Sequence, residues 1–208
     1  MDERLRYFRG TGVIFRSGLL FRNPVLVGAL GLYPIVAAGF GLKNAVVLSL
    51  LFLLIAIPSE IVLCVVGLLI PKWARPAAVL LVTAAFYIPS ALVLRGMLTD
   101  NWDTLSMAAA LTTCNSVLYS RAEEYAPEHI LPAVMADAAG CAAGFAAVLC
   151  LVASVRELWL TGGVWDLGTG GVGGGMNLPF AGFLLIGLLA ALVQRINLSR
   201  SSRGSREG

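Results

Sequence analysis

Residues 44–70 read NAVVLSLLFLLIAIPSEIVLCVVGLLI, an apolar run in which Glu60 is the one charged residue. A helix of about 20 mostly apolar residues is long enough to cross the hydrocarbon core of a bilayer. Together with this run, the stretches that qualify as spans cover residues 24–42, 44–70, 74–97, 104–119, 131–158 and 178–196. The sequence therefore predicts an all-α integral membrane protein with six transmembrane helices.

The composition of the whole chain agrees with this interpretation. Of its 208 residues, 58% are hydrophobic and 13% are charged, and the mean hydropathy is +0.85. Soluble domains are about 45–50% apolar and about 25% charged. The composition therefore excludes a soluble enzyme, a disordered tail and a nucleic-acid-binding domain, and it indicates the lipid bilayer as the surroundings of most of the chain.

Lysine and arginine are distributed unevenly over the predicted loops. With the N-terminus inside, twelve of the 15 basic residues lie on the inner side, and the outer side holds Lys43, Arg95 and Arg156. Cytoplasmic loops of membrane proteins carry an excess of basic residues, and an even number of spans returns the C-terminus to the side of the N-terminus. We therefore expect a multi-pass protein of the inner (cytoplasmic) membrane with both termini in the cytoplasm.

Two terminal segments flank the predicted spans. Residues 5–20 alternate arginine with bulky apolar residues, which is typical of an amphipathic segment at a membrane interface. We divide the chain into this cytoplasmic or interfacial segment over 1–22, a six-helix membrane domain over 23–198 and a basic cytoplasmic tail over 199–208.

Six spans divide into two sets of three, and an odd set size gives the two halves opposite orientations. The first helix of each set is irregular, since one contains LGLYPIVAAG over residues 30–39 and the other contains LTTCNSVLYS over residues 111–120. Paired, interrupted segments at corresponding positions indicate an inverted repeat with a site near the membrane midplane. We therefore expect both helices to be broken and the two breaks to meet.

The breaks are expected near Gly31–Pro34 and near Thr113–Ser116. Irregular backbone at this depth is tolerated where protein buries it or where it lines a cavity. The side chains of Thr113, Asn115 and Ser116 can hydrogen-bond the backbone groups that a break leaves unpaired.

Ionisable side chains inside a span are costly and often functional. Two interpretations of Glu60 stay open: an ion or proton pathway, or a neutral carboxyl hydrogen-bonded to a neighbouring helix. Asp137 lies near the inner end of the fifth span, with a structural or interface role. Arg156 and Glu157 lie at its outer end, where we expect a charged pair at the membrane interface.

Arg121 and Glu123 follow the fourth span. They form either a solvated turn or a link that pins the broken helix or meets a partner subunit. The cysteines lack tight ligand spacing and predict no metal site, and the glycine-rich residues 162–175 lack the Lys-Ser/Thr of a phosphate loop. No catalytic residues are predicted.

Several segments together resemble one known family. They are NPVLV over 23–27, LGLYP over 30–34, CNSVLYSRAEEYA over 114–126 and LPFAGF over 178–183. These segments are similar to motifs of the Rnf/Nqr membrane subunits, in particular the E subunit of Rnf complexes and the D subunit of Nqr complexes. The resemblance extends from residue 23 to about residue 195.

The resemblance implies a six-helix inverted repeat that pairs with a sister subunit of opposite topology. Flavin-carrying and iron–sulfur-carrying subunits belong to the same complexes, which couple electron transfer to the movement of Na⁺ or H⁺. In the family, the half-helices of the two subunits bring four cysteines to the dimer axis, where they hold a [2Fe–2S] cluster in the middle of the membrane.

This sequence departs from the family at both ligand positions. Counted back from Arg121, the second family cysteine corresponds to Ser116, and the first corresponds to Tyr33. Cys114 precedes Ser116 by two residues, about 200° around a helix, so it becomes a ligand only after a register shift. We therefore expect this subunit to bind no cofactor by itself. We also expect the Tyr33 ring to fill part of the vacated volume near the dimer axis, with its hydroxyl bonded to Ser116 or to a backbone carbonyl.

The sequence is compatible with two functions. The first is a non-catalytic or electron-relay subunit of a redox-driven, ion-translocating oxidoreductase. The second is a transporter or membrane scaffold that reuses the inverted repeat without electron transfer.

Overall fold

The computed structural model describes residues 12–15, 18–19, 24–38, 41–97, 102–163, 165, 170 and 179–204. Most of the predicted amphipathic segment, most of the glycine-rich loop and the end of the basic tail lie outside these residues. The described part of the chain is helical and contains no strand, which confirms the all-α class. The elements are α2 (Pro24–Gly28), α3 (Leu32–Ala38), α4 (Leu42–Val66), α5 (Arg75–Met97), α6 (Trp102–Leu111), η2 (Thr112–Cys114), α7 (Ser116–Ser120), η3 (Arg121–Tyr125), η4 (Ala126–Glu128), α8 (Leu131–Thr161) and α9 (Pro179–Gly204).

Three of the described helices are long and apolar enough to cross a membrane, and these are α4, α5 and α8. The shorter apolar stretch Phe180–Ile196 lies within α9. The predicted first and fourth spans are each divided into shorter helices. By length and composition, three of the described helices can span a membrane, and the six-span inverted repeat stays a prediction.

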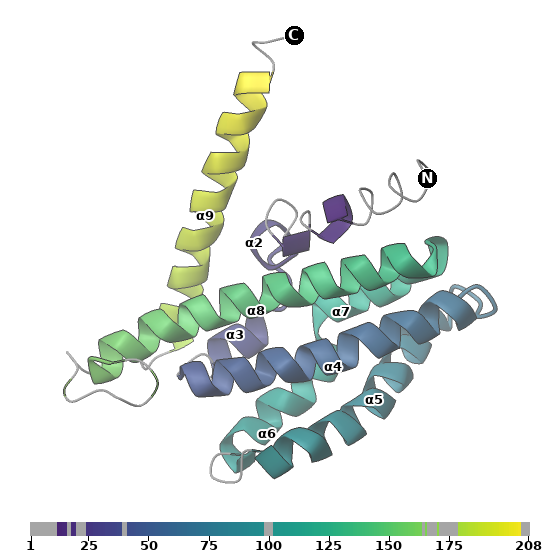
Figure 1. Ribbon diagram of the computed structural model, residues 1–208, viewed down its shortest axis with the longest axis horizontal. Helices are drawn as coiled ribbons and strands as arrows, with labels where there is room; N and C mark the ends of the chain where they lie inside the picture. The colour runs from purple at the N-terminus through teal and green to yellow at the C-terminus, as the bar shows by residue number, and fades with distance from the viewer. Residues whose placement is uncertain are drawn as a thin grey trace.

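The centre of the molecule is the pair of helices α4 and α8, which run side by side (Figure 1). In the most apolar part of each of these two helices, 56% of the residues are buried, whereas 22% are buried in the corresponding part of α5. The Phe52 and Phe145 rings stack across this pair with their centroids 4.5 Å apart. Small residues of α8 such as Ala142 and Gly144 are buried in the same contact, and small side chains allow such close approach.

The other helices surround this pair. α5 lies beside α4, and α9 rises away from the rest of the molecule towards the C-terminus (Figure 1). The described part of the N-terminal segment packs on α8, because a Cβ on Gly140 would lie 2.7 Å from the carbonyl oxygen of Phe15. A glycine is needed at this point of α8 for the two backbones to approach.

Both irregular helices are interrupted. Between α2 and α3 the chain passes through Ala29 and Gly31, whose φ angles are 52° and 68°. Pro34 lies inside α3 rather than in the break, because a proline in the first turn of a helix removes no intrahelical hydrogen bond. Between α6 and α7 the backbone is extended at Asn115, with φ −66° and ψ 127°.

Candidate functional site

The two interruptions lie against each other. The backbone N–H of Gly31 donates a hydrogen bond to the Ser116 hydroxyl at 2.8 Å, although the two residues are 85 positions apart in the sequence. A Cβ on Gly31 would lie 2.8 Å from the Asn115 Oδ1 atom, so the backbones meet only because position 31 is glycine. The same Oδ1 accepts a hydrogen bond from the Val117 N–H at 2.9 Å and caps the start of α7.

A threonine from α5 also supports the second interruption. The Thr83 hydroxyl, which is fully buried, donates to the carbonyl oxygen of Thr113 at 3.2 Å. The Thr113 hydroxyl itself donates to Ala110 in the preceding turn. Sequence reasoning missed Thr83, since a hydroxyl within an apolar helix gives no sign of which carbonyl it will meet.

Two charged residues near the end of α8 hold the ends of the neighbouring helices. Arg156 donates from Nη1 to the carbonyl oxygen of Val36 in α3 at 3.0 Å. The Glu157 carboxylate accepts a hydrogen bond from the Leu42 N–H at the start of α4 at 2.6 Å. A negative charge at a helix N-terminus is favourable. On the α9 side, Gly182 leaves room for the guanidinium, because its Cβ would lie 3.3 Å from Arg156 Nη1.

The expected place of these two residues at the membrane interface stays a prediction, and the structure adds that the protein buries both. Both side chains are buried, with exposures of 0% for Arg156 and 3% for Glu157. The Val36 carbonyl and the Leu42 N–H lie in the last turn of α3 and the first turn of α4. Backbone groups at helix ends lack intrahelical partners, and these two side chains supply them.

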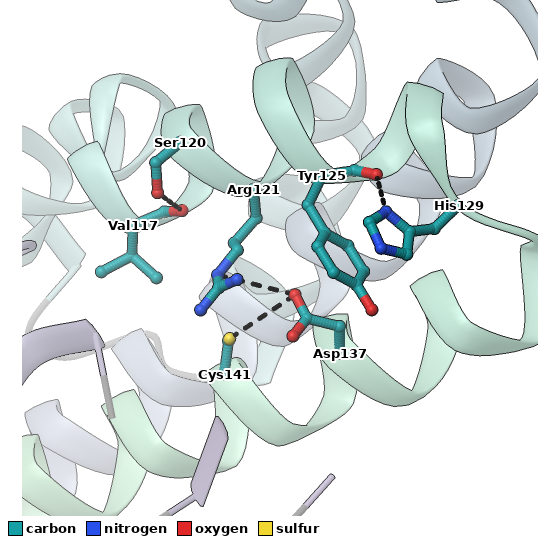
Figure 2. Close-up of polar contacts among 7 residues, drawn as sticks. All are labelled: Val117, Ser120, Arg121, Tyr125, His129, Asp137 and Cys141. Atoms are coloured by element: carbon teal, nitrogen blue, oxygen red, sulfur yellow. Dashed lines mark hydrogen bonds and ion pairs between the residues drawn. The ribbon is translucent and has the colours of Figure 1, made fainter. Parts of the chain in front are cut away.

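An ion pair connects the end of the second broken helix to α8. Arg121 Nε lies 3.6 Å from Asp137 Oδ2, and the Cys141 thiol lies 3.8 Å from the same oxygen (Figure 2). Arg121 thus links the turn after the second broken helix to α8, and its contact with a partner subunit stays a prediction. Glu123 is half-buried in the same π-helical turn. Asp137 is therefore a buried partner of this link.

Arg121, Asp137 and Cys141 form a polar cluster, and Tyr125 and His129 extend this cluster to the surface. Their rings stack with centroids 3.8 Å apart, and the Arg121 guanidinium lies 5.7 Å from the centre of the Tyr125 ring. Burial raises the pKa of the Tyr125 phenol, and the nearby charge of Asp137 raises it further. A cavity of about 390 Å³ opens here between α2 and η3, and Arg121 and Tyr125 contribute to its lining.

Glu60 lies next to this cluster, on α4. Its side chain is 1% exposed, and within the described residues its Oε2 atom has no hydrogen-bond partner. Asp137 and Arg121 are close enough for their charges to act on it. The structure therefore brings Glu60, Arg121 and Asp137 together, and separates them from Arg156 and Glu157 at the other end of α8.

Comparison with known proteins identifies the family. Residues 12–191 match the family described as Rnf-Nqr subunit, membrane protein. The chain belongs to the Rnf-Nqr subunit family. This family assignment confirms the resemblance that the motifs around the two broken helices indicated.

Curated relatives of this Rnf-Nqr protein are E subunits of oxidoreductase complexes. The chain is 26% identical over 188 residues to the E subunit of the proton-translocating ferredoxin:NAD(+) oxidoreductase complex of Clostridium ljungdahlii, covering 88% of each chain. It is 27% identical over 180 residues to the E subunit of the Na(+)-translocating ferredoxin:NAD(+) oxidoreductase complex of Acetobacterium woodii, covering 85% of this chain and 92% of the relative. It is 26% identical over 212 residues to the E subunit of the ion-translocating oxidoreductase complex of Vibrio parahaemolyticus, covering 93% and 92%.

Tyr33 and Ser116, which the resemblance is expected to align with cysteines, lie beside the two breaks in this Rnf-Nqr protein. Tyr33 is 49% exposed, and Cys114 and Ser116 are exposed as well. The Ser116 hydroxyl accepts from Gly31, and the expected bond to the Tyr33 hydroxyl is not found among the described residues. In the single chain the Tyr33 ring therefore lies at the surface of the crossing.

Proposed function

We propose that this chain is a membrane subunit of an Rnf-like, ion-translocating electron-transfer complex of the inner membrane, and that it pairs there with a sister subunit of opposite topology. The observation that carries the proposal is the contact between Gly31 and Ser116. It joins two interrupted helices at the positions where the resemblance places the redox site. The names of the relatives, all E subunits of ion-translocating complexes, support the same assignment.

The order of the elements supports a six-span inverted repeat. In the first half a broken helix, α2 with α3, is followed by α4 and α5. In the second half a broken helix, α6 with α7, is followed by α8 and α9. Each half thus contains one broken and two continuous helices in the same order, as expected for a repeat whose interface holds the site.

The exposed side chains at the crossing support a partner at this face. A half-exposed tyrosine and an exposed cysteine lie beside broken helices, where membrane proteins do not leave irregular backbone open to lipid. We therefore assign this face to the sister subunit. Flavin- and iron–sulfur-carrying subunits would exchange electrons with the complex on either side of the membrane.

The side chains at the crossing do not fit a [2Fe–2S] cluster that takes two ligands from this subunit. Such a cluster takes cysteine thiolates, or histidine in place of some of them. The two matching positions offer a phenol and a hydroxyl, and the Ser116 hydroxyl already accepts the Gly31 N–H. Cys114 is the one thiol beside the break in the described chain. We propose that this subunit contributes no pair of thiolates, and we derive no electron-transfer step through it.

A second candidate is a transporter or membrane scaffold that keeps the inverted repeat without electron transfer. The observation in its favour is that Tyr33 and Ser116 carry hydroxyl groups, which are weaker ligands for iron than thiolates. Purification through an affinity tag on this chain separates the two functions. The proposed function predicts that the sister, flavin-carrying and iron–sulfur-carrying subunits are recovered with the chain after mild detergent extraction. Recovery of the chain without any redox subunit would favour the second candidate.

A matched pair of variants tests the ligand assignment in the same preparation. A double substitution, Tyr33→Cys with Ser116→Cys, restores the family's thiols at the crossing. If the sister subunit supplies its own two cysteines, the complex should gain iron, acid-labile sulfide and a low-temperature paramagnetic signal on reduction. Cys114→Ser should leave all three unchanged in the otherwise unmodified complex. Loss of iron in Cys114→Ser would show that Cys114 is a ligand, so that this subunit supplies one thiolate instead of none.

A further inference from the structure

We infer that Glu60 is a proton-binding carboxyl of this subunit, loaded from the cytoplasmic side through the cavity beside Arg121. The inference rests on the proposed function, because it assigns the ion and the loading site within a complex that moves ions. The argument has three steps, which concern the burial of Glu60, the balance of charge around it and its access to water.

The first step is the burial of Glu60. The residue is 1% exposed in the last third of α4, and its Oε2 atom has no hydrogen-bond partner in the described chain. An ionised carboxylate buried without a partner costs many times more than a neutral one, and such groups take up a proton instead. We therefore infer that the Glu60 carboxyl carries a proton in this structure.

The second step is the balance of charge among the groups around Glu60. Asp137 and Cys141 on α8, and Arg121 and Tyr125 on η3, lie within electrostatic reach of it. Among these four groups Arg121 supplies the one positive charge, and its ion pair is with Asp137 at 3.6 Å. Two carboxyls thus share one guanidinium. The cluster is neutral when one proton is bound to Glu60 and carries one negative charge when that proton leaves.

The third step is access. The 390 Å³ cavity is lined by apolar residues of α2 and of the first break, Val27 and Leu30, and by Arg121, Glu124 and Tyr125. Its volume exceeds that of several water molecules at about 30 Å³ each. Arg121 and Tyr125 line the cavity and also lie within electrostatic reach of Glu60. Glu60 itself does not line the cavity, so we assign the last step to water that enters between Arg121 and Tyr125. A hydronium ion there gives its proton to the Glu60 carboxylate and leaves as water, so no other reactant is needed.

The same geometry favours a proton over Na⁺. A sodium ion needs several oxygen ligands around it. Of the two carboxyls in this cluster, Asp137 is already paired with Arg121 at 3.6 Å. A proton needs only the single unpartnered oxygen that Glu60 presents.

The test uses membranes that contain the assembled complex and dicyclohexylcarbodiimide, an apolar reagent that modifies protonated carboxyls. Mass spectrometry of this chain should find the adduct on Glu60, with labelling that falls as the pH is raised. Glu60→Gln should abolish the adduct, while Glu128→Gln, which changes an exposed carboxyl on η4, should leave it unchanged. Absence of the adduct from Glu60 in the unmodified chain would overturn the inference.

Substitutions of the ion pair separate an electrostatic role from a structural one. Arg121→Gln removes a positive charge, so Glu60 should stay labelled to a pH about one unit higher. Asp137→Asn removes a negative charge, so the pH of half-labelling should fall by a similar amount. If the substitutions only damaged the fold, the pH of half-labelling would shift in the same direction in both variants. That result would contradict the inference. Arg121→Lys, which keeps the charge, should keep the original midpoint and shows that the site survives substitution.

Sodium provides the last arm of the experiment. Labelling of Glu60 at constant pH and ionic strength should be the same in NaCl and in KCl. If Na⁺ but not K⁺ lowers the labelling of Glu60, the site binds sodium, and the inference of a proton site is wrong. The proposed function fails separately, because it fails when the redox subunits are not recovered with the tagged chain, whereas the labelling of Glu60 does not depend on electron transfer.

Discussion

Gly31 shows at the scale of a single residue why the two broken helices can meet. Its φ of 68° lies in the left-handed region, which costs other L-residues roughly 1–2 kcal/mol. A side chain here would also meet the Asn115 Oδ1 atom at 2.8 Å and the Val117 side chain at 3.0 Å. The backbone turn and the close contact with the second break thus both require glycine.

Gly31→Ala should therefore lower the free energy of unfolding by about 1–3 kcal/mol, from the strained φ and the displaced contact. The measurement is the thermal unfolding midpoint of the detergent-solubilised protein. Gly41→Ala is the matched control, because nothing lies within 4 Å of its Cβ position and its φ is −148°. Equal midpoints for the two variants would show that the crossing does not depend on Gly31.

At the scale of elements, Arg156 and Glu157 act as caps supplied by one helix to two others. Arg156→Met keeps the length of the side chain but leaves the Val36 carbonyl without its donor. An unsatisfied buried group costs about 1–3 kcal/mol, and we expect a loss of stability of that size. Arg95→Met, at an exposed position of α5, should change stability by less than about 0.5 kcal/mol. A similar effect of both substitutions would argue against the capping role of Arg156.

Glu157 offers a graded version of the same experiment. Glu157→Gln keeps an oxygen acceptor for the Leu42 N–H and loses only the charge, whereas Glu157→Leu loses both. The expected order of unfolding midpoints is unmodified protein, then Glu157→Gln, then Glu157→Leu. Because a hydrogen bond to a charged group contributes about 1.5–3 kcal/mol, the leucine variant should lose stability by that amount. A leucine variant as stable as the glutamine variant would contradict the assignment.

The broken helices could be predicted from the sequence, but their support could not. Gly31 and Asn115 are residues that leave helical geometry locally, and their chemistry is visible in LGLYP and TTCNS. The partners of Arg156 and Thr83 depend on which carbonyls the folded chain places beside them. In apolar helices that are partly buried on several sides, periodicity gives no hint of that placement. This is why the contacts of Arg156 with Val36 and of Glu157 with Leu42 could not be predicted.

At the scale of the whole molecule, orientation in the membrane decides which side of Glu60 meets the cytoplasm. Twelve basic residues on one side against three on the other predict an inner N-terminus and an outer loop over 162–175. In a variant without native cysteines, Gly168→Cys should react with an impermeant maleimide added outside intact cells, and Ser205→Cys should react only after lysis. Labelling of Gly168→Cys only from the cytoplasmic side would invert the topology and move the loading side of Glu60 with it.

The pairing with a sister subunit makes a prediction about Tyr33. The side chain is 49% exposed in the single chain, at the crossing that we assign to the dimer axis. Benzoylphenylalanine at position 33 is close to tyrosine in shape and forms a covalent bond with its neighbour on irradiation. In membranes it should give one product with the mass of this chain plus the sister subunit. The same probe at Leu92, which is 65% exposed on the lipid-accessible helix α5, should give little or none. A product that contains two copies of this chain would show a homodimer in place of the heterodimer. If position 33 gives no protein product, lipid covers the crossing, and a redox site cannot be shared between two subunits at this face.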